Sequence, residues 1–220
     1  HSHHDHAMDA PEVAKKTGAI LVGSNSTANI GLGYGLSEKQ ILVPKYGEKI
    51  KFGDFFITLL LSAHLPLSPF ITMLTGHEKH INEPLRLPAK IYDYKEGDSF
   101  AILIEHPNGN ILINGSAGYK KGLLNDVKAD VVFLGIAGIS YQNDKYKDEY
   151  YFEVIEKVSP SLIIPIHWDD FTVDYNKGLH PPNKFIDDFS SNLDYLISKT
   201  SKDSSKEIIL LPMWGNIGLF

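Results

Sequence analysis

The chain contains no cysteine, so disulfide bonds and thiolate metal ligands are both excluded. The absence of cysteine does not fix the cellular compartment. A cytoplasmic location is favoured, although no residue establishes it. No uninterrupted apolar run approaches the roughly 18 residues that a membrane-spanning helix requires. The longest run, from Phe55 to Leu61, includes Thr58 and has the length of a strand. We therefore expect no membrane span.

Arginine is almost absent, because Arg86 is the only one among 21 lysines and arginines. The formal net charge is −6. Nucleic-acid binding requires a basic surface, and bidentate clamps on phosphate are usually formed by arginine. The sequence therefore predicts a small-molecule substrate and no nucleic-acid partner, while a homo-oligomer stays open. No basic amphipathic segment favours a lipid-directed phospholipase.

The 220 residues, 43% hydrophobic and 22% charged, suffice for one sizeable core, and no linker indicates a second domain. We predict a single domain over 1–220 of mixed α/β class. Periodicity and turn residues predict strands over 20–22, 41–43, 49–52, 55–63, 99–105, 111–114, 130–136, 161–166 and 207–211. The helices are predicted over 7–16, 148–158 and 183–199. The glycines of 31–35 miss the dinucleotide-binding spacing by one position, so we interpret them as a flexible loop.

The first six residues, His1-Ser2-His3-His4-Asp5-His6, concentrate imidazoles around one carboxylate. In an extended segment His1 and His3 project to the same face, and Asp5 and His6 follow where a helix would begin. Neutral imidazole and carboxylate at this density are metal ligands. A histidine-rich tag is the alternative, but Ser2 and Asp5 interrupt the run and a carboxylate adds nothing to a tag.

This stretch resembles the signature motif of the metallo-β-lactamase-fold hydrolases. The resemblance is greatest to the branch that contains ascorbate-6-phosphate lactonase-like and N-acylphosphatidylethanolamine phospholipase D-like enzymes. It implies a four-layer αββα sandwich. In that family the motif follows an earlier group of strands, whereas here it begins at His1. We therefore expect that this chain lacks the first strands of the fold.

The resemblance also implies a set of metal ligands. One ion would be held by three histidines, with the third after an apolar strand: His1, His3 and His64. A second ion would be held by Asp5, His6 and His167. His167 lies in a segment that matches the family well, Ile-Pro-Ile-His-Trp with a following Phe171. We expect one or two divalent ions, with zinc favoured and manganese or iron as alternatives.

Ser116 is the main departure from the family pattern. Relatives read Gly-Asp-Thr-Gly-Tyr, with an aspartate that bridges both metals, where this chain reads Gly-Ser-Ala-Gly-Tyr over 115–119. A neutral hydroxyl supplies neither the charge nor the reach to hold two cations ~3.5–4 Å apart. Three outcomes stay open: one metal only, two metals with water in the gap, or a site that no longer catalyses.

The resemblance implies a metal-dependent hydrolase that uses a metal-bound hydroxide on a small ester, lactone or phosphodiester, with Asp5 orienting the nucleophile. The alternative is a catalytically degenerate metal-binding protein, with Ser116 as the mark of lost catalysis. The candidate substrate contacts are His77, His80, Arg86 and Trp168. For the first two a solvated loop is the alternative, and Trp168 fits an ordinary core position equally well.

Overall fold

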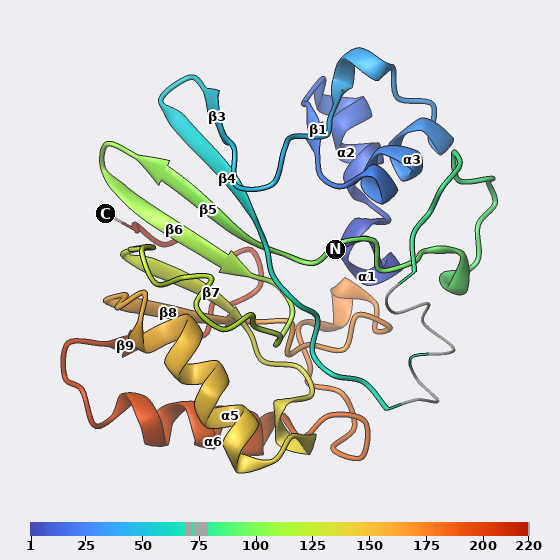
Figure 1. Cartoon of the computed structure of the whole chain (residues 1–220). Coiled ribbons are helices and arrows are strands. Elements are labelled where there is room, and N and C mark those ends of the chain that lie inside the picture. The colour runs from blue at the N-terminus through green and yellow to red at the C-terminus, as the bar shows by residue number, and fades with distance from the viewer. Residues whose placement is uncertain (69–71, 73–78, 220) are drawn as a thin grey trace. The chain divides into compact units, whose positions relative to one another are not determined.

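Figure 1 shows the computed structural model of the chain, which describes residues 1–68, 72 and 79–219. The chain divides into two compact units. Unit 1 comprises His1–Ile50 and Pro66–Phe100, and unit 2 comprises Lys51–Leu65 and Ala101–Phe220. The prediction of one domain over 1–220 stays a prediction. Among the helices of the described residues, none has the length and apolar character that crossing a bilayer requires.

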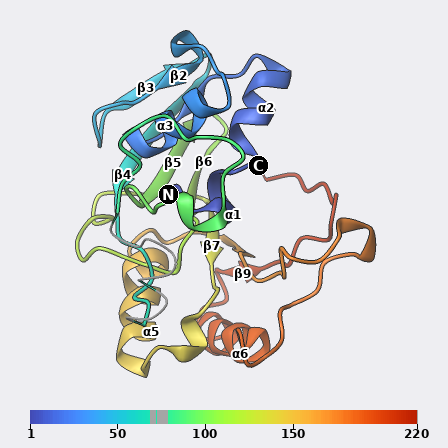
Figure 2. The same cartoon turned by 90° about the vertical axis from the view of Figure 1, so that its right-hand side faces the viewer.

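Unit 1 consists of short helices beside a two-stranded parallel ladder. Its elements are α1 (His4–Ala7), α2 (Ala10–Thr17), β1 (Leu21–Val22), α3 (Asn25–Gly33), β2 (Ile41–Leu42) and 3-10 turns at Glu38–Gln40 and Ile91–Asp93. Leu21 pairs with Ile41, and α2 and α3 lie beside the ladder (Figure 2). Pro11 in the first turn of α2 and Gly18, with a φ of 74°, set the ends of that helix.

The flexible loop predicted over 31–35 is wrong, because α3 continues through Gly33. The helix begins at a cap in which the Ser24 side chain accepts a hydrogen bond from the Thr27 N–H. A Cβ at Gly33 would lie 2.2 Å from the carbonyl oxygen of Leu85. Glycine is therefore needed here for a close approach between the helix and a neighbouring segment, and not for flexibility.

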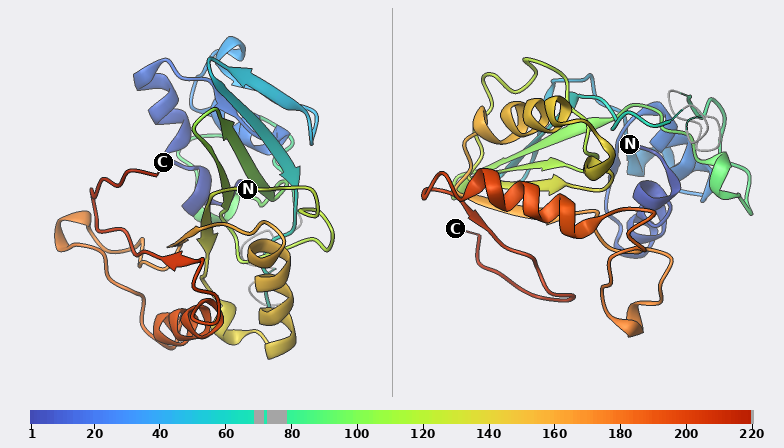
Figure 3. Two further views of the ribbon diagram at one scale, coloured as in Figure 1. Left: turned by 90° about the vertical axis from the view of Figure 1, so that its left-hand side faces the viewer. Right: turned by 90° about the horizontal axis from the view of Figure 1, so that it is seen from below.

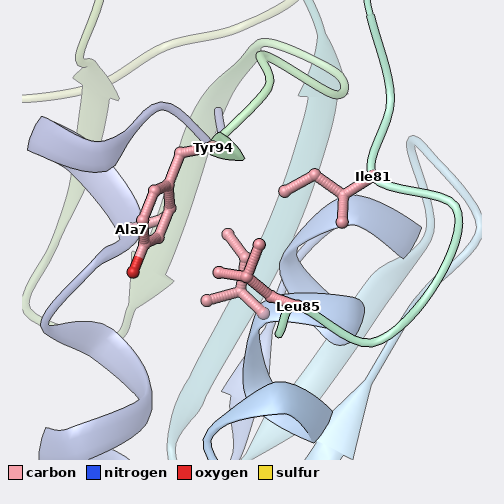
Figure 4. Packing of buried hydrophobic residues seen from close by; sticks show 5 residues of the cluster. Ala7, Ile81, Leu85 and Tyr94 are labelled. Carbon is pink, nitrogen blue, oxygen red and sulfur yellow. The ribbon is translucent and has the colours of Figure 1, made fainter. Parts of the chain in front are cut away.

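A buried apolar cluster joins α1 and α3 to the segment that approaches them. It consists of Ala7, Ile30, Ile81, Leu85 and Tyr94 (Figure 4). Because Ala7 is the last residue of α1, this packing holds the short helix that carries the end of the histidine cluster. The helix has only four residues, so tertiary packing and not intrinsic propensity stabilises it.

Seven strands form one mixed sheet, which lies in unit 2 except for the first residues of β3 and β5. The strands are β3 (Lys49–Phe52), β4 (Phe55–Leu61), β5 (Phe100–His106), β6 (Gly109–Asn114), β7 (Val131–Gly135), β8 (Leu162–Ile166) and β9 (Glu207–Ile208). They follow one another across the sheet in chain order (Figure 3). The predicted hairpin at Asn108-Gly109 joins the antiparallel pair β5 and β6.

The strands β6, β7 and β8 run parallel, so their carboxyl ends meet at one edge of the sheet. Asn114 pairs with Leu134, and Gly135 pairs with Ile166. The segments that leave this edge carry Ser116 after β6 and His167 after β8. In open sheets of this kind, ligands bind at the carboxyl ends of the strands.

Two helices lie beside each other along one side of the sheet (Figures 1 and 3). They are α5 (Asp144–Tyr151), which continues into a π-helical turn at Phe152–Glu156, and α6 (Phe189–Thr200). Asp148 joins them, because it accepts a hydrogen bond from the Tyr195 hydroxyl at 2.9 Å and pairs with Lys199 at 2.7 Å. The class is therefore mixed α/β, as the sequence predicts.

Replacement of Ile163 by alanine should destabilise the sheet. Ile163 is fully buried in β8, so the change leaves a cavity and should lower the free energy of unfolding by about 2–5 kcal/mol. Ile197→Ala is the matched control, since Ile197 is 47% exposed on α6 and should cost less than ~1 kcal/mol. Urea unfolding followed by circular dichroism measures both, and equal losses would contradict the assigned core.

Candidate metal centre

The imidazole rings of the first six residues gather in unit 1. The ring centroids of His1 and His3 are 4.8 Å apart with their planes at 89°, and those of His1 and His6 are 3.8 Å apart. Ring nitrogens of His1 and His3 lie within 4.8 Å of each other. Zinc–nitrogen bonds of about 2.0–2.1 Å hold two ligand nitrogens no more than about 4.2 Å apart, so these two rings need only a small rotation to share one ion.

Ser2 fixes the backbone between these two histidines. It is fully buried; its N–H donates to the carbonyl oxygen of Glu96 at 2.7 Å, and its hydroxyl is 2.9 Å from that of Thr27. In an extended segment the side chain of residue 2 points away from those of residues 1 and 3. Anchoring Ser2 to the interior of unit 1 therefore holds both imidazoles on the opposite face.

Asp5 lies between the imidazoles of His4 and His6 in the first turn of α1. Its Oδ1 is 3.6 Å from Nδ1 of His4, and its Oδ2 is 3.4 Å from Nε2 of His6. His4, which belongs to neither expected ligand set, thus lies beside the carboxylate. Imidazole and carboxylate together form a donor set that suits zinc, manganese or iron, so the chemistry of these residues fits a divalent ion.

His64 belongs to unit 2 and follows β4 by three residues. Its Nδ1 is 2.8 Å from the carbonyl oxygen of Leu65. A carbonyl can only accept, so Nδ1 carries the hydrogen of this bond. In the neutral ring, Nε2 is then left with its lone pair, which is the arrangement found in metal-ligating histidines.

Ser116 lies against residues 63–65, which are named the His64 segment. Its hydroxyl oxygen accepts a hydrogen bond from the N–H of Leu65 at 3.0 Å. Two residues later, a Cβ at Gly118 would lie 2.1 Å from the carbonyl oxygen of Ala63 and 2.4 Å from the carbonyl carbon of His64. The segment after β6 thus touches the backbone on both sides of His64.

Behind this segment lies a buried polar network that sequence reasoning did not find. The Asn114 side-chain amide donates to the carbonyl oxygens of Ser116 at 2.7 Å and Gly118 at 3.1 Å. It also lies 3.2 Å from the Tyr150 hydroxyl, which donates to the Gly135 carbonyl at 2.7 Å. Burial raises the pKa of Tyr150, so this phenol stays protonated and remains a donor. These partners are 2 to 36 residues apart in the sequence, and no local motif marks them.

His167 follows β8 in an unusual backbone conformation. Its φ of 56° lies in the left-handed region, which residues other than glycine seldom adopt, although histidine does so more often than most. Such strain occurs preferentially at functional positions. The next residue, Trp168, is half-buried, with its ring 5.0 Å from that of Phe189, so it packs on the first residue of α6.

The remaining candidate substrate contacts receive less support. His77 lies outside the described residues. His80 and Arg86 are both exposed in unit 1. Their assignment as substrate contacts stays a prediction.

Comparison with known proteins identifies the fold. No protein-family model matches the chain, and no curated protein matches it. Among solved structures, the metallo-β-lactamase fold protein YhfI from Bacillus subtilis is similar, with 15% identity and a TM-score of 0.54 over 96% of this chain and 72% of that one. A proposed metal-dependent hydrolase from Parabacteroides distasonis gives 15% identity and a TM-score of 0.50 over the same shares. The chain therefore has the metallo-β-lactamase fold.

Gly118→Ala should destabilise unit 2. The added methyl group would meet the backbone of Ala63 and His64, which cannot rotate away as a side chain can. We expect the free energy of unfolding to fall by about 1–3 kcal/mol. Gly218→Ala is the control, because a Cβ there meets nothing within 4 Å and should change stability by less than ~0.5 kcal/mol. Thermal unfolding compares the two, and an unaffected Gly118→Ala would show that the contact is not tight.

Proposed function

We propose that this protein is a metal-dependent hydrolase of small esters, lactones or phosphodiesters. The observation that carries the proposal is the grouping of the His1, His3 and His6 rings around one place, with the Asp5 carboxylate beside them. A dense group of imidazoles and a carboxylate suits a hydrolytic metal. The likeness to metallo-β-lactamase-fold structures supports the fold, and the motif resemblance supports the chemistry.

The ligand sets follow the motif. His1, His3 and His64 form the first set, and Asp5, His6 and His167 form the second. When bound, a divalent ion supplies Lewis acidity and lowers the pKa of a water ligand to about 7. Asp5 would orient a water molecule through its carboxylate oxygens and would take up its proton, because a carboxylate is an acceptor when ionised. The Nδ1–H bond of His64 to Leu65 keeps that ring in the tautomer whose Nε2 can bind.

Ser116 makes the two sets unequal. Without a bridging carboxylate, the second set contributes one negative charge from Asp5 and two neutral rings. We propose one tightly held ion, with zinc favoured, and a second that binds more weakly. A homo-oligomer and the lactonase-like or phospholipase D-like branch stay proposals of the motif resemblance.

A second candidate function is metal binding without turnover. It is favoured by the engagement of the Ser116 hydroxyl, which accepts the Leu65 N–H at 3.0 Å and supplies no charge to a second metal. The two functions differ in one measurement, the hydrolysis of the three ester classes by the zinc-loaded and manganese-loaded protein. Turnover that disappears in His64→Ala supports the hydrolase, and absence of turnover in every case supports the binding protein.

Metal stoichiometry is the first test of the ligand assignment. After loading with zinc and desalting, elemental analysis should find about one ion per chain in the native protein, and about two in Ser116→Asp, because the added carboxylate supplies the missing charge. Two ions in the native chain would show that Ser116 does not limit the second set. No ion in either protein would refute the hydrolase.

The histidine variants provide the matched control for this experiment. His64→Ala should lose the tightly held ion, because two imidazoles alone bind zinc weakly. His180→Ala should retain it, since His180 is bonded to the carbonyl oxygen of Lys177 on a different segment of unit 2. Equal metal content in the two variants would contradict the role given to His64.

A further inference from the structure

We propose that Ser116 is a positioning residue for His64. It stands where relatives carry the bridging aspartate, yet its hydroxyl accepts a hydrogen bond from the backbone of the His64 segment. This inference rests on the proposed function, because it takes His64 as a metal ligand. It gives Ser116 a structural role in addition to the loss of the bridging carboxylate.

The first step concerns the contact itself. The backbone N–H of Leu65, the residue after His64, donates to Ser116 Oγ at 3.0 Å. The carbonyl oxygen of the same residue accepts the Nδ1–H of His64 at 2.8 Å. Both polar groups of the Leu65 backbone therefore help to hold the His64 ring. The N–H fixes the position of the His64 segment, and the carbonyl oxygen fixes the tautomer of the ring and the direction of its Nε2.

The second step concerns the rigidity of Ser116. Its carbonyl oxygen accepts from the Asn114 amide at 2.7 Å, and the carbonyl oxygen of Ala117 accepts from the Tyr146 hydroxyl at 2.9 Å. Asn114 is only 2% exposed, so its hydrogen bonds are sheltered from competing water. A hydroxyl on so firmly held a segment can fix the position of the His64 segment, whereas one on a mobile loop would move with it.

The third step is the packing around the His64 segment. Gly118 allows the backbone to approach Ala63 and His64, since a Cβ would meet Ala63 at 2.1 Å. A Cβ at Gly138 would lie 2.7 Å from a side-chain carbon of Leu65. The His64 segment thus packs against two segments that contain glycine, and the Ser116 hydroxyl adds a hydrogen bond to these contacts.

The test compares Ser116→Ala, which removes the hydroxyl, with Ser116→Thr, which keeps it. In the metal-free protein, amide hydrogen exchange followed by NMR should show Leu65 exchanging about five to ten times faster in Ser116→Ala, as expected for the loss of one hydrogen bond. Ser116→Thr should exchange at the native rate. Circular dichroism establishes that each variant is folded.

Zinc titration with a competing chelator then measures affinity for the first ion. We expect Ser116→Ala to bind about tenfold more weakly and Ser116→Thr to bind like the native protein, since groups that orient a ligand typically change metal affinity by 10–100-fold. Faster exchange with unchanged affinity would overturn the positioning role. Unchanged exchange would overturn the contact itself.

A native protein that binds no zinc would overturn the proposed function, and with it the role of Ser116 toward a metal. The exchange measurement separates the two failures, because it is made without metal. Native zinc binding combined with unaltered affinity in Ser116→Ala refutes only the inference about Ser116.

Discussion

The carboxyl edge of the sheet depends on the hydrogen bonds of the buried Asn114 side-chain amide. Its hydrogen bonds reach two carbonyls of the segment after β6 and the hydroxyl of Tyr150, which in turn binds the end of β7. A buried amide is costly to leave unsatisfied, so these partners constrain one another. This network also positions the His64 segment, because Ser116 and Gly118 contact it directly.

Much of this arrangement follows from the sequence, and the limits have physical causes. Asn108-Gly109 between apolar runs predicts the β5–β6 hairpin, and the buried strands β7 and β8 are apparent from their apolar runs. The loop predicted around Gly33 was wrong, because the sequence does not distinguish a glycine required for close packing from a glycine in a loop. The start of α6 at Phe189 was missed, although Asp188 caps the helix by accepting from the Ser191 N–H. The bond from the Gly138 N–H to the buried Asp187 carboxylate joins residues 49 apart and leaves no local pattern.

The candidate site was likewise predictable only in part from the sequence. The cluster from His1 to His6 is visible because its members are adjacent, and the extended backbone at His3 explains why alternate residues share a face. Ser116 is identified as a departure from a motif, but its contact with Leu65 depends on two segments 51 residues apart. Tyr150 and Asn114 give no sequence signal, because a buried tyrosine and a strand-end asparagine suit an ordinary core.

The close contacts of Gly118 and Gly138 with the His64 segment limit where residues can be inserted into this chain. Loops at the rim of a fold usually accept insertions, and residues that bind ligands are often placed on such loops. Here the spacing from Asn114 to Gly118 is fixed at both ends, by carbonyls that bind the amide and by a backbone approach without room for a Cβ. One inserted residue would remove both contacts together. Insertions, evolved or engineered, should therefore be tolerated better in other segments of the rim than in residues 114–118.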